Sequence, residues 1–191
     1  PLTNALAHLH ENGLVHRDVK PSNIIFVNGV PKLADIGLVA DIGEARSFVG
    51  TQGFIAPEGP GTPQADLYSL GKVLYEMATG LDRQEFPKLP PNLRELPDAD
   101  TLVEFNEIIL KACDDDPRRR YVTAAAMCND LALLQAGKSI QWLRVVERRL
   151  ALFFRVGLVG VALLVVAGGL YWGARTQARA TARQLYVAEM N

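Results

Sequence analysis

The stretch VHRDVKPSNIIF, residues 15–26, decides how the rest of the chain is interpreted. It sets a His-Arg-Asp triplet, a lysine and an asparagine directly before an apolar run. By itself it has a plain explanation, because these residue types are common in loops and Pro-Ser-Asn is ordinary turn chemistry. Its meaning therefore depends on the elements and motifs that surround it.

Apolar residues at helical spacing predict a mostly α-helical domain around this stretch. The pattern occurs four times, over residues 2–13, 64–79, 101–113 and 122–136. Gly80 and Gly137 follow the second and fourth of these segments, where a glycine commonly ends a helix. A proline-rich stretch, residues 86–97, is predicted to be extended.

One small β-hairpin is predicted inside this helical domain. Residues 24–27 indicate a short buried strand, and residues 31–34 begin the return strand. Asn28-Gly29 between them is a strong signal for a tight hairpin turn. The irregular pattern from residue 35 to residue 61 then predicts a long loop segment, which in compact domains usually carries function.

Composition and charge argue against several classes of function. The chain has 191 residues and a formal net charge of −1, so no overall basic balance favours a nucleic-acid partner. Its two cysteines, Cys113 and Cys128, lack metal-ligand spacing. A zinc site or a disulfide framework is therefore not expected.

Residues 156–174 contain no charged side chain and predict a single transmembrane helix. At 1.5 Å of rise per residue, their length matches a hydrocarbon core of about 30 Å. Tyr171 and Trp172 lie near one end, where interfacial aromatic residues are expected. The alternative is a soluble helical protein in which this stretch is a core helix, although a core helix usually has a polar face.

Basic residues on the two sides of this stretch predict its orientation in the plasma membrane. More of them precede it than follow it: Lys138, Arg144, Arg148, Arg149 and Arg155 before it, and Arg175, Arg179 and Arg183 after it. We therefore expect residues 138–155 to form a basic juxtamembrane linker and the preceding domain to be cytoplasmic. Residues 175–191 would begin an extracytoplasmic region, with the lipid bilayer as a partner.

Four motifs follow the opening stretch in a definite order. They are Asp35-Ile36-Gly37, GTQGFIAPE at residues 50–58, DLYSLG at residues 66–71 and DPRRRY at residues 116–121. With the HRDxKxxN pattern, this series resembles the C-terminal lobe of the protein kinase family over residues 1–137. The resemblance implies a mostly α fold with a small β-hairpin, and transfer of phosphate from ATP to a protein substrate.

The resemblance assigns chemistry to four residues. Asp18 would accept or orient the proton of the substrate hydroxyl, and Lys20 would contact the γ-phosphate of ATP. Asn23 and Asp35 would supply oxygen ligands to Mg²⁺, a hard cation that prefers oxygen. A lysine two residues after the aspartate resembles the serine/threonine form of the kinase loop, so the implied substrate class is serine/threonine.

Other residues resemble structural parts of the same lobe. His16 resembles the residue that packs beneath the metal-binding triplet, here Asp35-Ile36-Gly37. Asp66 resembles the buried helix carboxylate that holds the backbone of the catalytic loop, here the HRDxKxxN pattern of residues 16–23. Thr51 resembles a residue with a structural role near Asp18 and Lys20. Each of these would otherwise be interpreted as an ordinary polar side chain.

An ion pair and a phosphorylation switch are also implied. Glu58 and Arg120 resemble a buried ion pair that ties the end of the activation segment, here GTQGFIAPE at residues 50–58, to the helical base. The spacing Asp-Pro-x-x-Arg selects Arg120 over the neighbouring arginines. Arg17 precedes Asp18, as in kinases whose activation segment is switched by phosphorylation. Ser47 is the candidate acceptor, and an unmodified loop serine is the equal alternative.

The chain departs from the kinase pattern in two ways. Ile36 replaces the usual phenylalanine of the metal-binding triplet, while Asp35 is intact. No glycine-rich loop or strand lysine precedes Pro1, so we expect a fragment that lacks the N-terminal lobe and is inactive by itself. A non-catalytic, membrane-tethered kinase-like scaffold is the alternative to an enzyme.

Three further stretches of sequence narrow the resemblance, the first of them inside the lobe. The phrases LDRQEFPKLP, AGKSIQWLRVVERRL and ARQLYVAEMN are similar to membrane-anchored bacterial serine/threonine kinases. In that class a cytoplasmic kinase is joined by one span to a C-terminal sensing or repeat region. A homodimer formed through the span is compatible with such a receptor.

Overall fold

The computed structural model describes residues 1–42, 49–137 and Trp172. The chain divides into two units, residues 1–140 and 141–191, and the fold below is that of the first. Apart from Trp172, the predicted linker, transmembrane helix and C-terminal region lie outside the described residues, as does Ser47. Within the described part of the chain, no helix combines the length and the apolar character needed to cross a bilayer.

Helix α2 (Pro63–Thr79) is the core of the unit and confirms the second predicted helix. Thr62 caps its N-terminus, because its Oγ1 accepts a hydrogen bond from the backbone N–H of Ala65 at 3.1 Å. It ends at Gly80, which adopts a left-handed conformation with φ 69°. Every residue from Ala65 to Val73 is buried, as expected for a helix enclosed on all sides.

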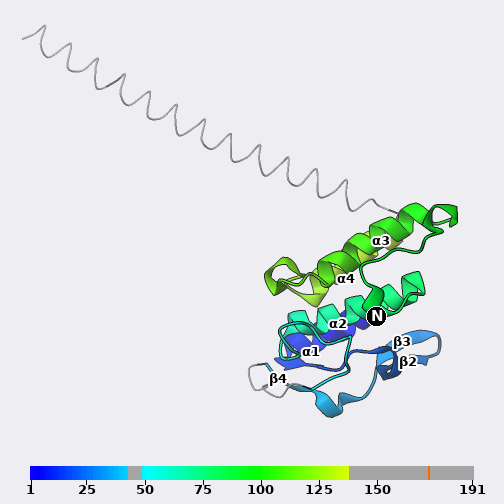
Figure 1. Cartoon of the computed structure of the whole chain (residues 1–191). Helices are drawn as coiled ribbons and strands as arrows, with labels where there is room; N and C mark the ends of the chain where they lie inside the picture. Colours follow the sequence, from blue (N-terminus) through cyan, green and yellow to red (C-terminus); the bar gives the residue numbers. More distant parts are fainter. Residues whose placement is uncertain (43–48, 138–171, 173–191) are drawn as a thin grey trace, which may run out of the picture. The chain divides into compact units, whose positions relative to one another are not determined.

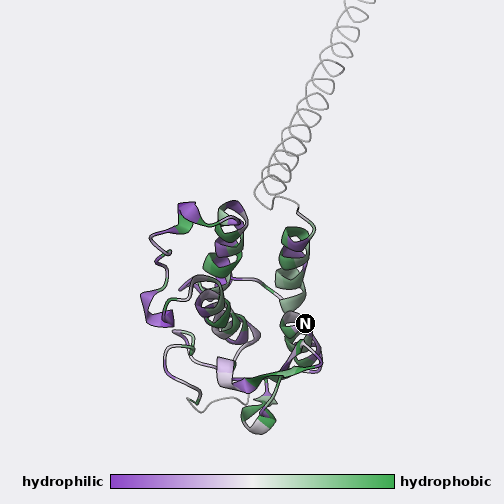
Figure 2. Ribbon diagram, turned by 90° about the vertical axis from the view of Figure 1, so that its right-hand side faces the viewer, coloured by the Kyte–Doolittle hydropathy of each residue, from purple (hydrophilic) through white to green (hydrophobic). Residues whose placement is uncertain are grey.

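Three other helices share the core of α2 and confirm the remaining helical predictions to within a few residues. They are α1 (Leu2–Glu11), α3 (Ala99–Ala112) and α4 (Ala124–Gln135) (Figures 1 and 2). Gly71 allows α2 and α3 to approach closely, because a Cβ at this position would lie 2.5 Å from Sγ of Cys113. Apolar side chains of all four helices share one core cluster.

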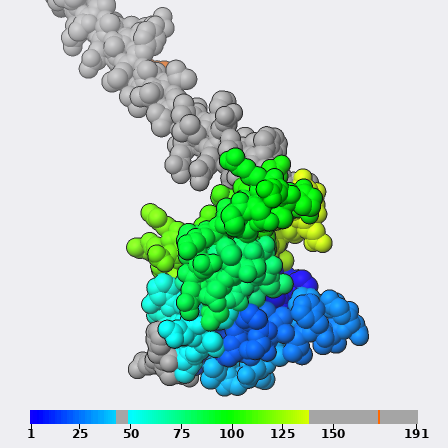
Figure 3. All heavy atoms as spheres, turned by 45° about the vertical axis from the view of Figure 1, so that its right-hand side comes forward, coloured from blue at the N-terminus to red at the C-terminus, as the bar shows by residue number. Residues whose placement is uncertain are grey.

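The predicted hairpin is present, as β2 (Ile24–Val27) paired antiparallel with β3 (Val30–Leu33). Asn28 and Gly29 have φ values of 51° and 76°, which is the geometry of the tight turn that their sequence predicts. The prediction that the first strand is buried is wrong, since the Phe26 side chain is 66% exposed. The hairpin projects from the helical body (Figure 3), and only Ile24 and Leu33 at its base pack against the core.

The segments predicted to lack regular structure contain short elements. Strands β1 (Leu14–Val15) and β4 (Ala40–Asp41) form a second two-stranded sheet that the sequence pattern did not predict. The remaining elements are single 3₁₀ turns: η1 (Pro21–Asn23), η2 (Ile36–Leu38), η3 (Arg83–Glu85), η4 (Leu93–Glu95) and η5 (Pro117–Arg119). The prediction that residues 86–97 are extended is therefore wrong at η4. There the backbone N–H and C=O groups form local i→i+3 hydrogen bonds with each other.

Candidate active site

The loop after β1 is fixed to the core by one carboxylate. Asp66 lies in the first turn of α2 and is 1% exposed. Its Oδ2 accepts the backbone N–H of His16 and its Oδ1 that of Arg17, both at 2.8 Å. Arg17 has a φ of 72°, an uncommon conformation for a residue with a side chain, and these two bonds hold it. The buried helix thus sets the backbone from which Asp18 projects.

A third group on Asp66 was missed by the sequence analysis. Nε2 of His10, on α1, lies 2.9 Å from Asp66 Oδ2. Because an ionised carboxylate only accepts, Nε2 is the donor, and Nδ1 is left buried with no hydrogen-bond partner in the described part of the chain. The available signal was position: His10 follows Leu6 by four residues and therefore lies on the apolar face of the helix.

Asp18 is the centre of a compact polar cluster. Its Oδ2 lies 2.7 Å from Nζ of Lys20, and its Oδ1 accepts a hydrogen bond from the Thr51 hydroxyl at 2.9 Å. Lys20 also donates to Oγ1 of Thr51 at 2.9 Å. Asn23 donates from Nδ2 to the backbone oxygen of Asp18 at 2.9 Å and to its Oδ2 at 3.1 Å. The structure thus brings four of the predicted site residues into direct contact.

The cluster keeps the Asp18 carboxylate charged. Burial alone would raise its pKa, but the opposing contributions prevail: hydrogen bonds from Lys20 and Thr51, the positive charge of Lys20 and the hydrogen bond from Asn23. The net effect places the pKa of Asp18 below its ordinary value. At neutral pH this group is therefore an anion that can accept a hydrogen bond or a proton.

This shift predicts a pH dependence of folding stability. A carboxylate whose pKa is lowered by folding stabilises the protein above its unfolded pKa of about 4, and the stabilisation is lost as the pH falls through the lowered value. Asp18→Asn should therefore be less stable than the wild type at pH 7, and the difference should shrink below about pH 4. Urea unfolding followed by circular dichroism measures both.

The matched control for this series is Asp41→Asn, which removes the charge of an exposed aspartate in β4. Its stability difference from the wild type should change much less over the same pH range. A difference for Asp18→Asn that is constant from pH 7 to pH 3 would contradict the assigned shift.

The hairpin register brings the two predicted metal ligands to one end of the sheet. Asn23 directly precedes β2 and Asp35 follows β3, and Ile24 pairs with Leu33. The backbone N–H of Ala34 donates to the carbonyl of Asn23 at 2.8 Å, which closes this end. Asp35 is exposed and its Oδ1 accepts from the backbone N–H of Gly37 at 3.2 Å.

These residues fit a magnesium ion that also takes ligands from a nucleotide. The Asn23 amide is oriented by donating Nδ2 to Asp18, which leaves its Oδ1 available as a ligand. The described residues contain no group of three or more His, Cys, Asp or Glu able to hold a metal. Mg²⁺ commonly uses one or two protein oxygens together with phosphates and water, so Asn23 and Asp35 suit that role.

His16 joins the loop to the hairpin end. Its side chain is completely buried, and Nε2 lies 3.3 Å from the backbone oxygen of Ala34, the residue before Asp35. The predicted position of His16 next to the Asp-Ile-Gly triplet agrees with this contact. Ile36, which replaces the usual phenylalanine, is expected to remain an apolar, packed residue, but its side chain is 75% exposed.

Glu58 and Arg120 form the expected ion pair, with unequal burial. Arg120 donates from its two terminal nitrogens to Oε1 and Oε2 of Glu58 at 2.6 and 2.8 Å. The Arg120 side chain is 0% exposed, whereas that of Glu58 is 26% exposed. Arg120 also donates to the backbone oxygens of Asp114 and Gln64 and lies over the Tyr68 ring. The pair ties the segment after Thr51 to the turn before α4.

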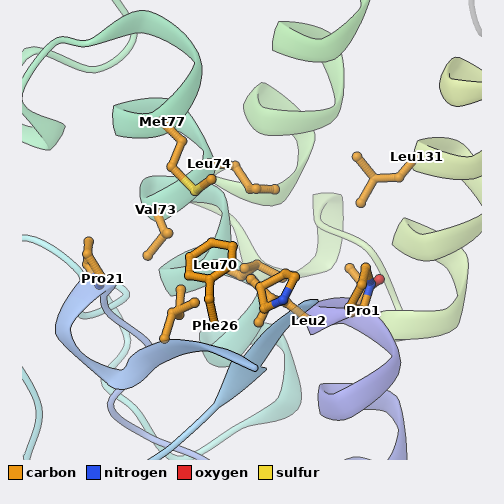
Figure 4. A pocket seen from close by; sticks show the side chains of 12 residues that line it. Pro1, Leu2, Pro21, Phe26, Leu70, Val73, Leu74, Met77 and Leu131 are labelled. Atoms are coloured by element: carbon orange, nitrogen blue, oxygen red, sulfur yellow. The ribbon is translucent and has the colours of Figure 1, made fainter. Parts of the chain in front are cut away.

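A separate apolar hollow of about 380 Å³ lies between the hairpin and the helices (Figure 4). Residues from α1, β2, α2 and α4 line it, including Leu2, Phe26, Val73 and Leu131. None of the residues assigned to phosphate transfer or metal binding lines it. It is therefore distinct from the polar site around Asp18.

The geometry around Asp18 defines a class of site. A buried helix fixes a loop that presents a charged carboxylate beside a lysine, while an amide and a second carboxylate flank the same end of a hairpin. This is an arrangement suited to phosphoryl transfer, which depends on positioning and charge rather than on covalent chemistry. Residues 1–131 match the protein kinase domain, and the chain belongs to the protein kinase family.

Several bacterial serine/threonine kinases are similar to the chain. Serine/threonine-protein kinase PknB of Mycolicibacterium smegmatis is 34% identical over 160 residues, which cover 71% of this chain and 25% of PknB. Serine/threonine-protein kinase PknL of Mycobacterium tuberculosis is 35% identical over 152 residues, covering 69% of this chain and 38% of PknL. A probable serine/threonine-protein kinase of Clostridium perfringens is 33% identical, covering 73% and 23% respectively. The chain thus spans roughly a quarter to two fifths of these relatives.

Proposed function

We propose that the protein is a serine/threonine protein kinase that transfers the γ-phosphate of MgATP to protein hydroxyls. The observation that carries the proposal is the contact of Lys20, Asn23 and Thr51 with a single charged carboxylate, Asp18. A kinase needs such a carboxylate next to fixed positive charge. The kinase domain match and the serine/threonine kinases among its relatives support the substrate class.

In the proposed reaction, the side-chain oxygen of a serine or threonine attacks the γ-phosphorus, and the bond to the β-phosphate oxygen breaks to release ADP. Asp18 accepts or orients the proton of the attacking hydroxyl. Lys20 lies 2.7 Å from Asp18 and places positive charge where the γ-phosphate must approach. Asn23 and Asp35 would hold Mg²⁺, which neutralises charge on the phosphates.

The scaffold residues keep this geometry in place. Asp66 holds the loop backbone through His16 and Arg17, and Arg120 with Glu58 holds the far end of the activation segment. Arg17 would be the partner of a phosphate on Ser47, if the protein is switched in that way.

Phosphoamino-acid analysis tests the proposal. The full-length protein is incubated with γ-labelled ATP, Mg²⁺ and a mixed protein acceptor, with a chelator control. We expect label on serine and threonine, and only with Mg²⁺. Label on tyrosine alone would overturn the substrate class, and no transfer at all would favour the non-catalytic scaffold.

The proposal includes a single-pass anchor in the plasma membrane with the kinase in the cytoplasm. Its support is the uncharged stretch of residues 156–174, preceded by a larger number of basic residues than follow it. The lipid bilayer and a second copy of the chain are the partners that this topology allows.

Alkaline carbonate extraction of cell membranes tests the anchor. We expect the full-length protein to stay in the membrane pellet, because a spanning helix resists washing. A variant that lacks residues 156–174 should move to the soluble fraction. Release of the wild-type protein by carbonate would contradict the anchor and leave the kinase proposal unaffected.

A further inference from the structure

Residues 51–54 lead directly away from the polar cluster around Asp18. The Thr51 hydroxyl bonds to both Asp18 and Lys20, so this end of the segment is part of the cluster. At the other end, the hydroxyl of Ser69 on α2 donates to the backbone oxygen of Phe54 at 2.7 Å. A hydroxyl that reaches Asp18 therefore lies close to Thr51, at one end of this segment.

The side chain of Arg83, from turn η3, packs against the same segment. Its guanidinium carbon lies 4.5 Å from the centre of the Phe54 ring, a cation–π geometry. Its Nε donates to the backbone oxygen of Gln52 at 3.4 Å. A Cβ at Gly53, where φ is 88°, would lie 2.5 Å from the same Nε. Glycine thus lets Arg83 approach the backbone closely.

Arg83 is itself fixed to the core helix. Oε1 of Glu76 accepts hydrogen bonds from the Arg83 backbone N–H at 3.1 Å and from its guanidinium at 3.0 Å. Lys72 donates to the Arg83 backbone oxygen at 3.0 Å. Glu76 and Lys72 both belong to α2, which also carries Ser69 and Asp66. One helix therefore determines the positions of the catalytic loop, the segment and the arginine.

We infer that Arg83 is a positioning residue that shapes the surface on which the acceptor polypeptide lies. This inference rests on the proposed kinase function and adds a residue that the motif pattern does not contain. Within the described part of the chain, Arg83 makes no hydrogen bond or ion pair with Asp18, Lys20, Asn23 or Asp35, so its removal should leave nucleotide use intact. Its loss should release Gln52 and Phe54 and weaken binding of the protein acceptor.

The test compares Arg83→Ala, Arg83→Lys and Glu76→Gln with the wild type in the full-length natural protein. We expect Arg83→Ala to raise the KM for the protein acceptor about tenfold, with kcat and the KM for ATP changed less than about twofold. Arg83→Lys should be intermediate, because it retains the cation and loses the Nε contact. The matched control is Arg118→Ala, which removes a 90% exposed arginine that pairs with Asp116.

Glu76→Gln and hydrogen exchange separate positioning from general loosening. If Glu76 acts through Arg83, then Glu76→Gln should add little to Arg83→Ala in the double variant. Amides of residues 52–55 should exchange faster in Arg83→Ala, while those of α1 and α4 stay unchanged. This readout does not depend on activity.

The outcomes distinguish this inference from the proposed function. If the wild type transfers no phosphate, the proposed function fails. If the wild type is active and Arg83→Ala leaves the acceptor KM unchanged, this inference alone is overturned. The inference is also overturned if Arg83→Ala lowers kcat, raises both KM values and lowers the melting temperature together. Arg83 would then have only a structural role.

Discussion

Asp18→Asn in the full-length protein should lower kcat for phosphate transfer by about 10²–10⁴-fold, the range that a positioned general base contributes. The substitution keeps the shape of the side chain and its acceptor for the Thr51 hydroxyl, and removes the negative charge that Lys20 approaches to 2.7 Å. ATP affinity should change much less than kcat. Steady-state kinetics with ATP and a protein acceptor measure both quantities.

The control for this variant is Asp100→Asn, an exposed residue in the first turn of α3, which should keep wild-type kcat. A fall of less than about tenfold in Asp18→Asn would show that Asp18 does not act on the proton in the rate-determining step. The wild-type and variant proteins must show the same circular dichroism spectrum, so that a folding defect is not mistaken for lost chemistry.

Glu58→Ala should destabilise the fold by at most about 3–5 kcal/mol, the cost of removing one partner from a fully buried ion pair, because Glu58 itself is partly exposed. The reason is the unequal burial of the pair. Arg120 is 0% exposed, so its charge stays out of water when the carboxylate is lost. Its bonds to the backbone oxygens of Asp114 and Gln64 persist and favour the lower end of the range. Thermal unfolding monitored by circular dichroism measures the loss.

A second substitution tests the cause of this destabilisation. Adding Arg120→Met to Glu58→Ala removes the stranded charge, so the double variant should be more stable than Glu58→Ala. Arg118→Ala, which breaks only an exposed contact with Asp116, should leave the melting temperature unchanged. An unchanged melting temperature in Glu58→Ala would contradict the structural role given to the pair.

The sequence predicted the parts of the site that motif order and local turn chemistry determine. Asp18, Lys20 and Asn23 occur within six residues, so one loop brings them together. The Asn28-Gly29 turn sets the hairpin register, and that register places Asn23 near Asp35. The order of the motifs also paired Glu58 with Arg120, although 62 residues separate them.

Contacts made only by tertiary packing could not be predicted in the same way. His10 meets Asp66 across 56 residues, and Arg83 meets Gln52 across 31. No local pattern records which side chains face each other after the helices pack. The exposure of Phe26 was missed for the same reason: an apolar run predicts a strand, but burial depends on what covers it.

The most direct test of the central claim is a crystal structure of the full-length protein's kinase region with Mg²⁺ and a non-hydrolysable ATP analogue. We expect Mg²⁺ at about 2.1 Å from Oδ1 of Asn23 and from a carboxylate oxygen of Asp35. The γ-phosphate should lie beside Lys20, with the Asp18 carboxylate facing it. A nucleotide bound with its metal and γ-phosphate away from these four residues would contradict the assignment of this loop and hairpin as the phosphotransfer site.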